Sequence, residues 1–167
     1  MLSSDEKLVS MSLQAARMSK TISNLLEDVG LTVESVPLYN TSQHVLQKVK
    51  VYCDHHSEAH PAPAQPQPPK DKLEAITTMD SWDLKYLDDI NAEANQEFPF
   101  SHVLELLQAA NYLDIPSLLD LVSNYVAKHC LGKDVDQVRR MFNMQEPFSP
   151  QEIEAVNQEI EQRAQLI

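Results

Sequence analysis

The stretch that decides the fold is Leu106-Leu107-Gln108-Ala109-Ala110-Asn111-Tyr112-Leu113-Asp114-Ile115, with Pro116 next to it. It overlaps a strongly apolar segment that starts at Phe98, and we predict that this segment is buried. Asp114 and Pro116 open another helix, because proline has no amide hydrogen to lose in the first turn of a helix. Gly132 ends that helix, whose apolar positions are Leu118, Leu119, Leu121, Val122, Tyr125 and Val126.

Two further helices are predicted upstream. The apolar residues after Ser19 recur at spacings of three and four, as in a helix, and Gly30 ends it because glycine tolerates left-handed dihedrals. Asn40 or Thr41 caps the second helix, since a short polar side chain can bond the free amides of a first turn. The apolar positions of the two helices are Ile22, Leu25, Leu26 and Val29, then Val45, Leu46, Val49, Tyr52 and Cys53.

Two short segments are predicted to be extended. Residues 7–13 alternate loosely between apolar and polar side chains, which favours one short strand. Val36-Pro37-Leu38 is a second extended piece, and Pro37 limits it to the edge of a sheet because proline cannot donate a hydrogen bond there.

Residues 58–72 form the clearest boundary in the chain. Their prolines exclude a helix, and the segment has almost nothing to bury, so we predict an exposed, partly polyproline-like loop. A spacer is the favoured interpretation, and a ligand for a proline-recognising domain is the alternative. Asp80 or Ser81 opens the next helix. Its Trp82 is interpreted as a packing anchor, with a binding hot spot as the alternative.

Two helices are predicted after Gly132. Asp134 begins a short one with Val135, Val138 and Phe142, and Ser149-Pro150-Gln151-Glu152 is a capping-box sequence that begins the last helix. The last helix has only a thin apolar stripe, so we expect it to bury that stripe against something else. The stripe consists of Ile153, Val156, Ile160 and Ile167.

Composition excludes several classes of function. The 167 residues carry a formal net charge of −12, which repels phosphate backbones and argues against nucleic-acid binding. The two glycines argue against a phosphate-binding loop. The two cysteines do not suggest a disulfide framework and fit a reducing cytosolic or nuclear compartment. We expect no secretory signal and no membrane-spanning segment.

The residues that could carry chemistry form no convincing catalytic set. Cys53-Asp54-His55-His56, with His60, is the metal-like cluster, but no second ligand pair follows it, and a buried cysteine before a polar helix end is favoured. A metal-dependent enzyme built on Cys53, His55 and His56 is the alternative. Cys130 could in principle pair with His102 or His129, yet neighbours on a helix do not face each other, so His129 cannot activate it. We expect no enzyme, cofactor or metal.

The stretch from Leu106 to Ile115 closely resembles the signature of the Skp family, the adaptors of SCF-type (Skp–cullin–F-box) ubiquitin ligases. The resemblance continues in order through most of the chain, including Val36-Pro37-Leu38, Tyr52-Cys53-Asp54-His55-His56 and Trp82-Asp83. It implies an α+β, mostly helical fold: a BTB/POZ domain over residues 1–130 and two additional C-terminal helices over 131–167. The shorter elongin-C type, which ends near Asn111-Tyr112, is the alternative.

The resemblance implies a non-catalytic adaptor that bridges a cullin scaffold and F-box substrate receptors. The matching cullin-binding residues are Asn111 and Tyr112. The F-box would be held by apolar positions of the last helices, namely Leu119, Val126, Cys130, Phe142 and Met144. A structural adaptor of F-box proteins in a non-cullin assembly is the alternative function. We expect a cytoplasmic and nuclear location and a weak homodimer when the protein is free.

Two positions qualify the resemblance. The family usually has a Trp-Cys pair near the end of its last helix, where this chain has Gln162 and Arg163. Some unicellular members hydroxylate and glycosylate a proline that corresponds to Pro150, which makes it a candidate site of hydroxylation. A proline in the first turn of a helix accounts for Pro150 equally well.

Overall fold

The computed structural model describes residues 1–29, 35–59, 79–94, 98, 100–144 and 149–164, and in these ranges the chain is mostly helical. Extended pairing there is limited to two isolated bridges, an antiparallel one from Leu2 to Leu8 and a parallel one from Leu2 to Pro37. The expected α+β, mostly helical class is confirmed. The helices are α1 (Leu13–Ala16), α2 (Lys20–Val29), α3 (Gln43–Ala59), α5 (Ser81–Ala92), α6 (Ser101–Tyr112), α7 (Pro116–Cys130), α8 (Val135–Met141) and α9 (Pro150–Ala164).

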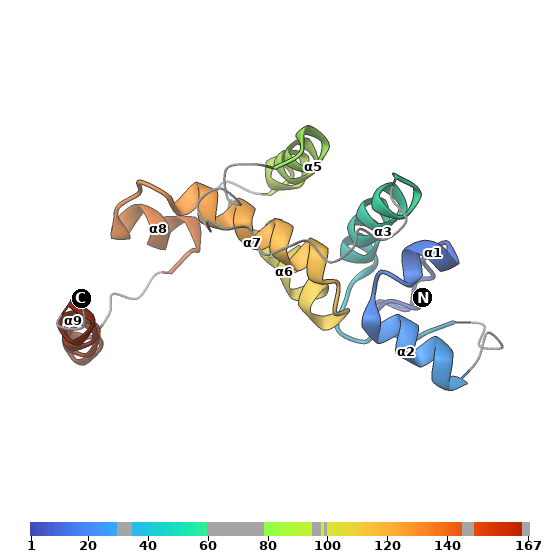
Figure 1. Ribbon diagram of the computed structural model, residues 1–167, viewed down its shortest axis with the longest axis horizontal. Helices are drawn as coiled ribbons and strands as arrows, with labels where there is room; N and C mark the ends of the chain where they lie inside the picture. The colour runs from blue at the N-terminus through green and yellow to red at the C-terminus, as the bar shows by residue number, and fades with distance from the viewer. Residues whose placement is uncertain (30–34, 60–78, 95–97, 99, 145–148, 165–167) are drawn as a thin grey trace.

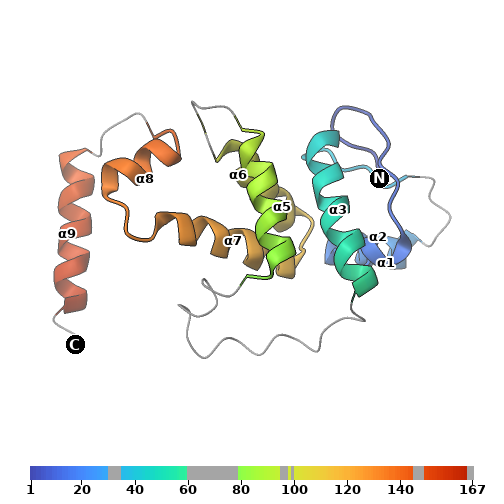
Figure 2. The ribbon, with the colours of Figure 1, turned by 90° about the horizontal axis from the view of Figure 1, so that it is seen from above.

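The helices follow one another along an elongated molecule. In Figure 1 the N-terminal segment and α1 to α3 lie at one end, α6 and α7 run through the middle, and α8 and α9 lie at the other end. Figure 2 shows the same order from above, with α9 beyond α8. None of the described helices combines the length and the apolar character needed to cross a membrane.

The core lies where α3, α5, α6 and α7 meet. The buried face of α7 consists of Leu118, Val122 and Tyr125, none more than 1% exposed. The Tyr125 hydroxyl donates to Asp88 Oδ1 of α5 at 2.8 Å, so the deepest tyrosine still has a hydrogen-bond partner. From α6 the core receives Val103, Leu106, Ala109 and Ala110, and from the other elements it receives Val45, Leu46, Val49, Tyr52, Cys53, Leu87 and Ile90.

The turn between α6 and α7 explains how the stretch from Leu106 to Ile115 ends one helix and leads into the next. The Asp114 amide donates to the Asn111 carbonyl at 3.2 Å, and the Ile115 amide donates to the Ala110 carbonyl at 2.9 Å. These two bonds form a Schellman motif, which satisfies the last carbonyls of a helix and needs one residue in the left-handed region. Asp114 is that residue, with φ of 48°. The chain then enters α7 at Pro116, and both helices put apolar faces into one core.

Substitution of Asp114 by valine is expected to lower the free energy of unfolding by about 1–2 kcal/mol, because a β-branched side chain clashes with the backbone at positive φ. Glycine at the same position is the matched control and should leave stability unchanged or slightly raised. The exposed Lys20–Asp114 ion pair (3.6 Å) is lost in both variants and contributes less than about 1 kcal/mol. Urea unfolding measures both, and equal losses would contradict the explanation by backbone strain.

Ser19 connects α2 to the turn after α6. Its hydroxyl donates to the Leu113 carbonyl at 2.5 Å and accepts from the Ile22 amide at 3.1 Å, so one side chain caps α2 and ties it to α6. Ser19 is 1% exposed. The helix predicted from Ser19 is therefore confirmed, whereas its predicted end at Gly30 falls outside the described residues.

The strand predicted over residues 7–13 is wrong. Only Leu8 of that segment forms a bridge, and Leu13 already begins α1. The Ser12 hydroxyl accepts the Ala15 amide at 3.1 Å, which is the contact that begins a helix, and the leucine and alanines that follow favour one. Of the extended piece predicted over Val36–Leu38, the structure confirms one isolated bridge, from Pro37 to Leu2.

The predicted caps and the loop boundary need small corrections. The helix after Thr41 begins at Gln43, and the Ser42 hydroxyl accepts the Val45 amide at 3.5 Å, so neither Asn40 nor Thr41 caps it. The first two residues of the exposed loop predicted over 58–72 instead belong to α3, which continues to Ala59, and the rest of that segment lies outside the described ranges. Asp80 is the N-cap of α5, as predicted.

Asp5 supplies a second cap for α3 from a distant part of the chain. Its carboxylate accepts the Gln43 amide at 2.8 Å. Hydrogen bonds from the Ser3 side chain and from that amide lower the Asp5 pKa from its usual 3.8 to about 2. A lowered folded-state pKa means that the stabilisation is complete above pH 3.8 and is lost as the pH falls through about 2.

The fall in unfolding free energy between about pH 4 and pH 2 should therefore be shallower for Asp5→Asn than for the parent protein. The amide keeps a hydrogen-bond acceptor but has no proton to bind. Urea unfolding at several pH values measures the slopes, and Asp28→Asn, on α2, is the control for loss of one carboxylate. Identical slopes for the parent and Asp5→Asn would contradict the assignment.

Candidate partner-binding surfaces

Asn111 and Tyr112 lie in the last turn of α6, beside α2. Asn111 is exposed and Tyr112 is partly buried. The Thr21 hydroxyl of α2 donates to the Tyr112 carbonyl at 3.2 Å, so the backbone of this turn is held from the side. An exposed amide and a half-covered phenol are suited to a partly polar interface. The structure thus places the two residues predicted to bind a cullin side by side at one surface.

A second apolar row of α7 lies at the margin of the core. Successive residues on a helix are turned by about 100°, so Leu119 and Val126 lie beside, and not within, the buried row of Leu118, Val122 and Tyr125. Both are partly buried against the core, and Cys130 continues the row at the end of the helix. Three of the residues predicted to hold an F-box therefore share one helix face.

Helix α8 continues this face beyond α7. Asp134 and Gln137 form a capping box, which confirms the predicted start of the helix. Val135 is 65% exposed, and none of the α8 residues is buried. Phe142 directs its ring toward the buried Phe100, with ring centroids 6.2 Å apart. Phe142 therefore attaches α8 to the core as well as forming part of the surface.

Met144 is held in place by the turn that ends α8. Asn143 has φ of 52°, and the Met144 amide donates to the Arg139 carbonyl at 2.9 Å, which repeats the turn that ends α6. The Met144 side chain is 51% exposed. We name Leu119, Val126, Cys130, Phe142 and Met144 the α7–α8 surface.

Helix α9 begins as the sequence predicted. The Ser149 amide donates to Glu152 Oε2 at 2.8 Å and the Glu152 amide donates to Ser149 Oγ at 3.3 Å, which is a capping box. Ile153 and Val156 are 50% and 53% exposed, so this part of the apolar stripe is available to a partner. The side chains of Ile160, Gln162, Arg163 and Ile167 fall outside the description.

Pro150 is exposed in the first turn of α9, where its missing amide hydrogen costs nothing. Hydroxylation there stays a prediction. The mass of the tryptic fragment containing Pro150, from protein made in its native cells, tests it, and an unmodified fragment would contradict it.

Cys53, His55 and His56 do not come together as a metal-type group in the part of the chain that the structure describes. Cys53 is 1% exposed, and burial raises the pKa of its thiol to about 12, which makes it a poor ligand and nucleophile. His55 stacks on Trp82 with centroids 3.7 Å apart, and His56 Nε2 lies 2.8 Å from Asp83 Oδ1. His60 lies outside the described ranges. The histidines thus join α3 to α5, and Trp82, stacked also on Tyr86 at 5.2 Å, acts as a packing anchor.

The two histidines considered as partners of Cys130 have other neighbours. His129 Nδ1 lies 2.9 Å from the Tyr125 carbonyl, and its ring also packs on Phe100. His102 instead lies in a group with His44 and Glu93, the one set of three metal-type side chains found close together among the described residues. Sequence spacing gave no signal for this set, because its members come from three separate helical segments.

A helical core followed by helices with exposed apolar residues is typical of a protein that binds other proteins. The sequence matches "Skp1 family, tetramerisation domain" at residues 1–58 and "Skp1 family, dimerisation domain" at residues 116–163. The chain belongs to the Skp1 family. The second match lies beyond the point at which the elongin-C type ends, so that alternative is not favoured.

Named relatives align over nearly the whole chain. "E3 ubiquitin ligase complex SCF subunit sconC" of Arthroderma benhamiae is 36% identical over 159 residues, covering 95% of this chain and 90% of the relative. The protein of the same name from Talaromyces stipitatus is 36% identical, with 95% and 92% covered. "SCF ubiquitin ligase complex protein SKP1a" of Dictyostelium discoideum is 37% identical over 161 residues, with 95% and 91% covered.

Proposed function

We propose that this chain is a non-catalytic adaptor subunit of an SCF-type ubiquitin ligase, which links a cullin scaffold to F-box substrate receptors. The observation that carries the proposal is the second apolar face of α7, continued by α8, in a member of a family whose relatives bear SCF names. An adaptor needs separate surfaces for its two partners. The proposed cullin surface lies at the end of α6, and the α7–α8 surface runs from Leu119, near the start of α7, to Met144 after α8.

The cullin is assigned to the surface around Asn111 and Tyr112. Both side chains lie on the last turn of α6, whose backbone is held by Thr21 and by the Schellman motif. A rigid turn costs little conformational entropy when a partner binds it. An exposed asparagine amide can both donate and accept hydrogen bonds, so it can match a polar edge of a scaffold helix.

The F-box is assigned to the α7–α8 surface. An amphipathic receptor helix laid on this surface would cover the half-exposed Met144 and the remaining accessible area of the partly buried Val126 and Phe142, at about 25 cal/mol for each Å² of apolar area. Ile153 and Val156 of α9 extend the available apolar area. The formal charge of −12 favours receptors whose contact face carries basic residues around its apolar centre.

The organisation of the chain follows from these assignments. We propose a BTB/POZ domain over residues 1–130 and an F-box-binding extension over residues 131–167. Helix α7 serves both, because one face completes the core and the next face lies on the partner side. We further propose that the adaptor works in the cytoplasm and the nucleus.

Affinity purification of the tagged full chain from its native cells, followed by mass spectrometry, tests the proposal. The unaltered chain should recover F-box proteins together with a cullin. Asn111→Arg should lose the cullin and keep F-box proteins, because it places a bulky charge at the exposed end of α6 alone. Lys133→Arg, an exposed conservative change, is the control.

The possible results separate the alternatives. Recovery of neither partner would refute the adaptor function. Recovery of F-box proteins without a cullin from the unaltered chain would support a structural adaptor outside SCF complexes and refute the ligase role.

A further inference from the structure

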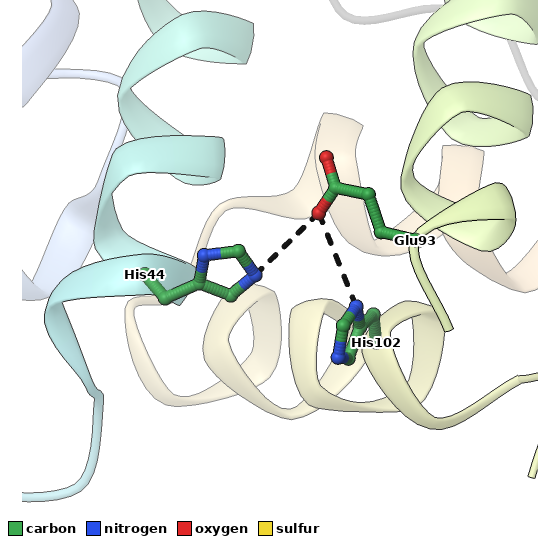
Figure 3. Close-up of side chains that lie close together, drawn as sticks. All are labelled: His44, Glu93 and His102. Carbon is green, nitrogen blue, oxygen red and sulfur yellow. Dashed lines mark ion pairs between the residues drawn. The ribbon is translucent and has the colours of Figure 1, made fainter. Parts of the chain in front are cut away.

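A group of three metal-type side chains lies between α3, α5 and α6. His44 comes from the first turn of α3, Glu93 is the C-cap of α5 and His102 comes from the first turn of α6. Figure 3 shows both imidazoles directed toward the Glu93 carboxylate. His44 Nε2 lies 3.6 Å and His102 Nδ1 lies 4.0 Å from Glu93 Oε2. All three donor atoms lie within 4.8 Å of one another.

These separations are close to those of a bound transition metal. Bonds of about 2.0–2.1 Å in a tetrahedral site put neighbouring ligand atoms roughly 3.3 Å apart. The two distances to Glu93 therefore exceed the required spacing by less than about 1 Å, which small side-chain rotations can supply. His44 and Glu93 have side chains that are 52% and 51% exposed, so both can move without disturbing the core.

The least mobile ligand also lacks any other partner. His102 Nδ1 is buried and makes no hydrogen bond among the described residues. A buried polar nitrogen without a partner is uncommon, because it loses its bonds to water and gains none in return. A metal ion at the point where the three donors meet would supply the missing interaction.

Lys48 already provides a cation beside this group. Its Nζ lies 2.5 Å from Glu93 Oε2, and its side chain is only 10% exposed. This hydrogen bond is the main reason why the Glu93 pKa is lowered from its usual value. The Lys48 ammonium and a metal would compete for Glu93 Oε2. The second carboxylate oxygen of Glu93 could then bind the one that is displaced.

We propose that His44, Glu93 and His102 form a binding site for one divalent transition metal of the zinc class. Two imidazoles and a carboxylate are donors that Zn²⁺ accepts, and imidazole also suits Ni²⁺ and Cu²⁺. Three protein ligands leave a fourth position for water or for a side chain of a partner. The bound ion ties the N-terminal turn of α3 to the C-terminus of α5 and to the first turn of α6.

The site has two measurable consequences. An ion that binds the folded chain and not the unfolded chain raises the unfolding temperature as its concentration rises. Metal binding needs neutral imidazoles, so affinity falls as the solution is acidified. Neither consequence depends on the proposed adaptor function.

Titration of the tag-free full chain with Zn²⁺, against a chromophoric competitor, tests the site. We expect one ion per chain and an unfolding temperature that rises with Zn²⁺. His44→Ala should weaken binding by at least about 10- to 100-fold, the loss that follows even when only a supporting partner of a metal ligand is removed. His102→Ala should do the same. Lys48→Met should strengthen binding, because it removes the competing ammonium.

His55→Ala is the matched control, since His55 lies on the same helix as His44 but stacks on Trp82. It should leave the affinity for Zn²⁺ unchanged. The site is refuted if Zn²⁺ does not raise the unfolding temperature, or if His44→Ala and His55→Ala bind it equally. Either result would refute the site and leave the adaptor proposal intact, because neither measurement involves F-box proteins.

Discussion

Replacement of Leu118 by alanine is expected to lower the free energy of unfolding by about 3–5 kcal/mol. Leu118 is 0% exposed and lies in the first turn of α7, directly after the turn that joins it to α6. The truncation removes apolar contacts and leaves a cavity that the surrounding helices cannot close, because α6 and α7 are held together by the Schellman motif. A loss of this size is a large part of the roughly 5–15 kcal/mol that stabilises a domain.

Leu131→Ala is the matched control for that measurement. Leu131 follows the same helix and loses the same atoms, but its side chain is 56% exposed. Its effect should stay within about 0.5 kcal/mol. Urea unfolding followed by circular dichroism compares the two, and similar losses would mean that α7 does not have the buried face described here.

Replacement of Val126 by aspartate is expected to weaken binding of an F-box protein by more than about 100-fold, which corresponds to roughly 3 kcal/mol. Val126 lies in the middle of the α7–α8 surface, between Leu119 and Cys130. An F-box helix that covers this position would bury an unpaired carboxylate, a change that costs about 3–5 kcal/mol. The prediction rests on the proposed function.

Lys128→Asp on the same helix separates position from charge. Lys128 is exposed and lies about 200° around α7 from Val126. Its substitution makes the chain more acidic than Val126→Asp does, yet we expect less than about 3-fold loss of F-box binding. Calorimetry with a purified F-box protein measures both affinities, and circular dichroism checks that each variant is folded. A greater loss for Lys128→Asp would place the F-box elsewhere.

The two substitutions in α7 are expected to affect different quantities, unfolding free energy for Leu118 and F-box affinity for Val126. Leu118 and Val126 lie on neighbouring faces of one helix, the first completing the core and the second bordering the partner surface. Stability should therefore depend mainly on the first and binding mainly on the second. Phe142 contributes to both the core and the α7–α8 surface, because its ring packs toward Phe100 while α8 extends the surface.

Local signals in the sequence predicted most of the helices. The capping sequence at Ser149–Glu152, the proline at position 116 and the N-cap at Asp80 all act within one turn, so they identify helix starts without tertiary information. Two errors came from local contacts that were misjudged, the Ser12 cap of α1 and the Ser42 cap of α3, whereas a further cap of α3 depends on a distant residue. The cap from Asp5 to α3 spans 38 residues and could not be read from the neighbourhood of Gln43.

The candidate surfaces were predicted by resemblance, and the structure added which residues share a face. Sequence periodicity shows that α7 is apolar at many positions, but it does not say which row is buried. That choice belongs to packing: α5 and α6 cover Leu118, Val122 and Tyr125 and leave Leu119 and Val126 at the margin. The role of Phe142 in attaching α8 is likewise a property of the assembled core.

The sequence by itself determined the helical architecture and the family of this protein. Short-range patterns predict the helices, and the order of motifs along the chain indicates the family. Only the tertiary structure decided the pairing of distant residues. In the folded chain, His55 of the cluster around Cys53 packs on Trp82, and Ser19 donates a hydrogen bond to the Leu113 carbonyl. His44, Glu93 and His102, which are distant in sequence, lie close together. The physical reason is that these contacts arise where separate helices pack, and no local spacing records the distance between them.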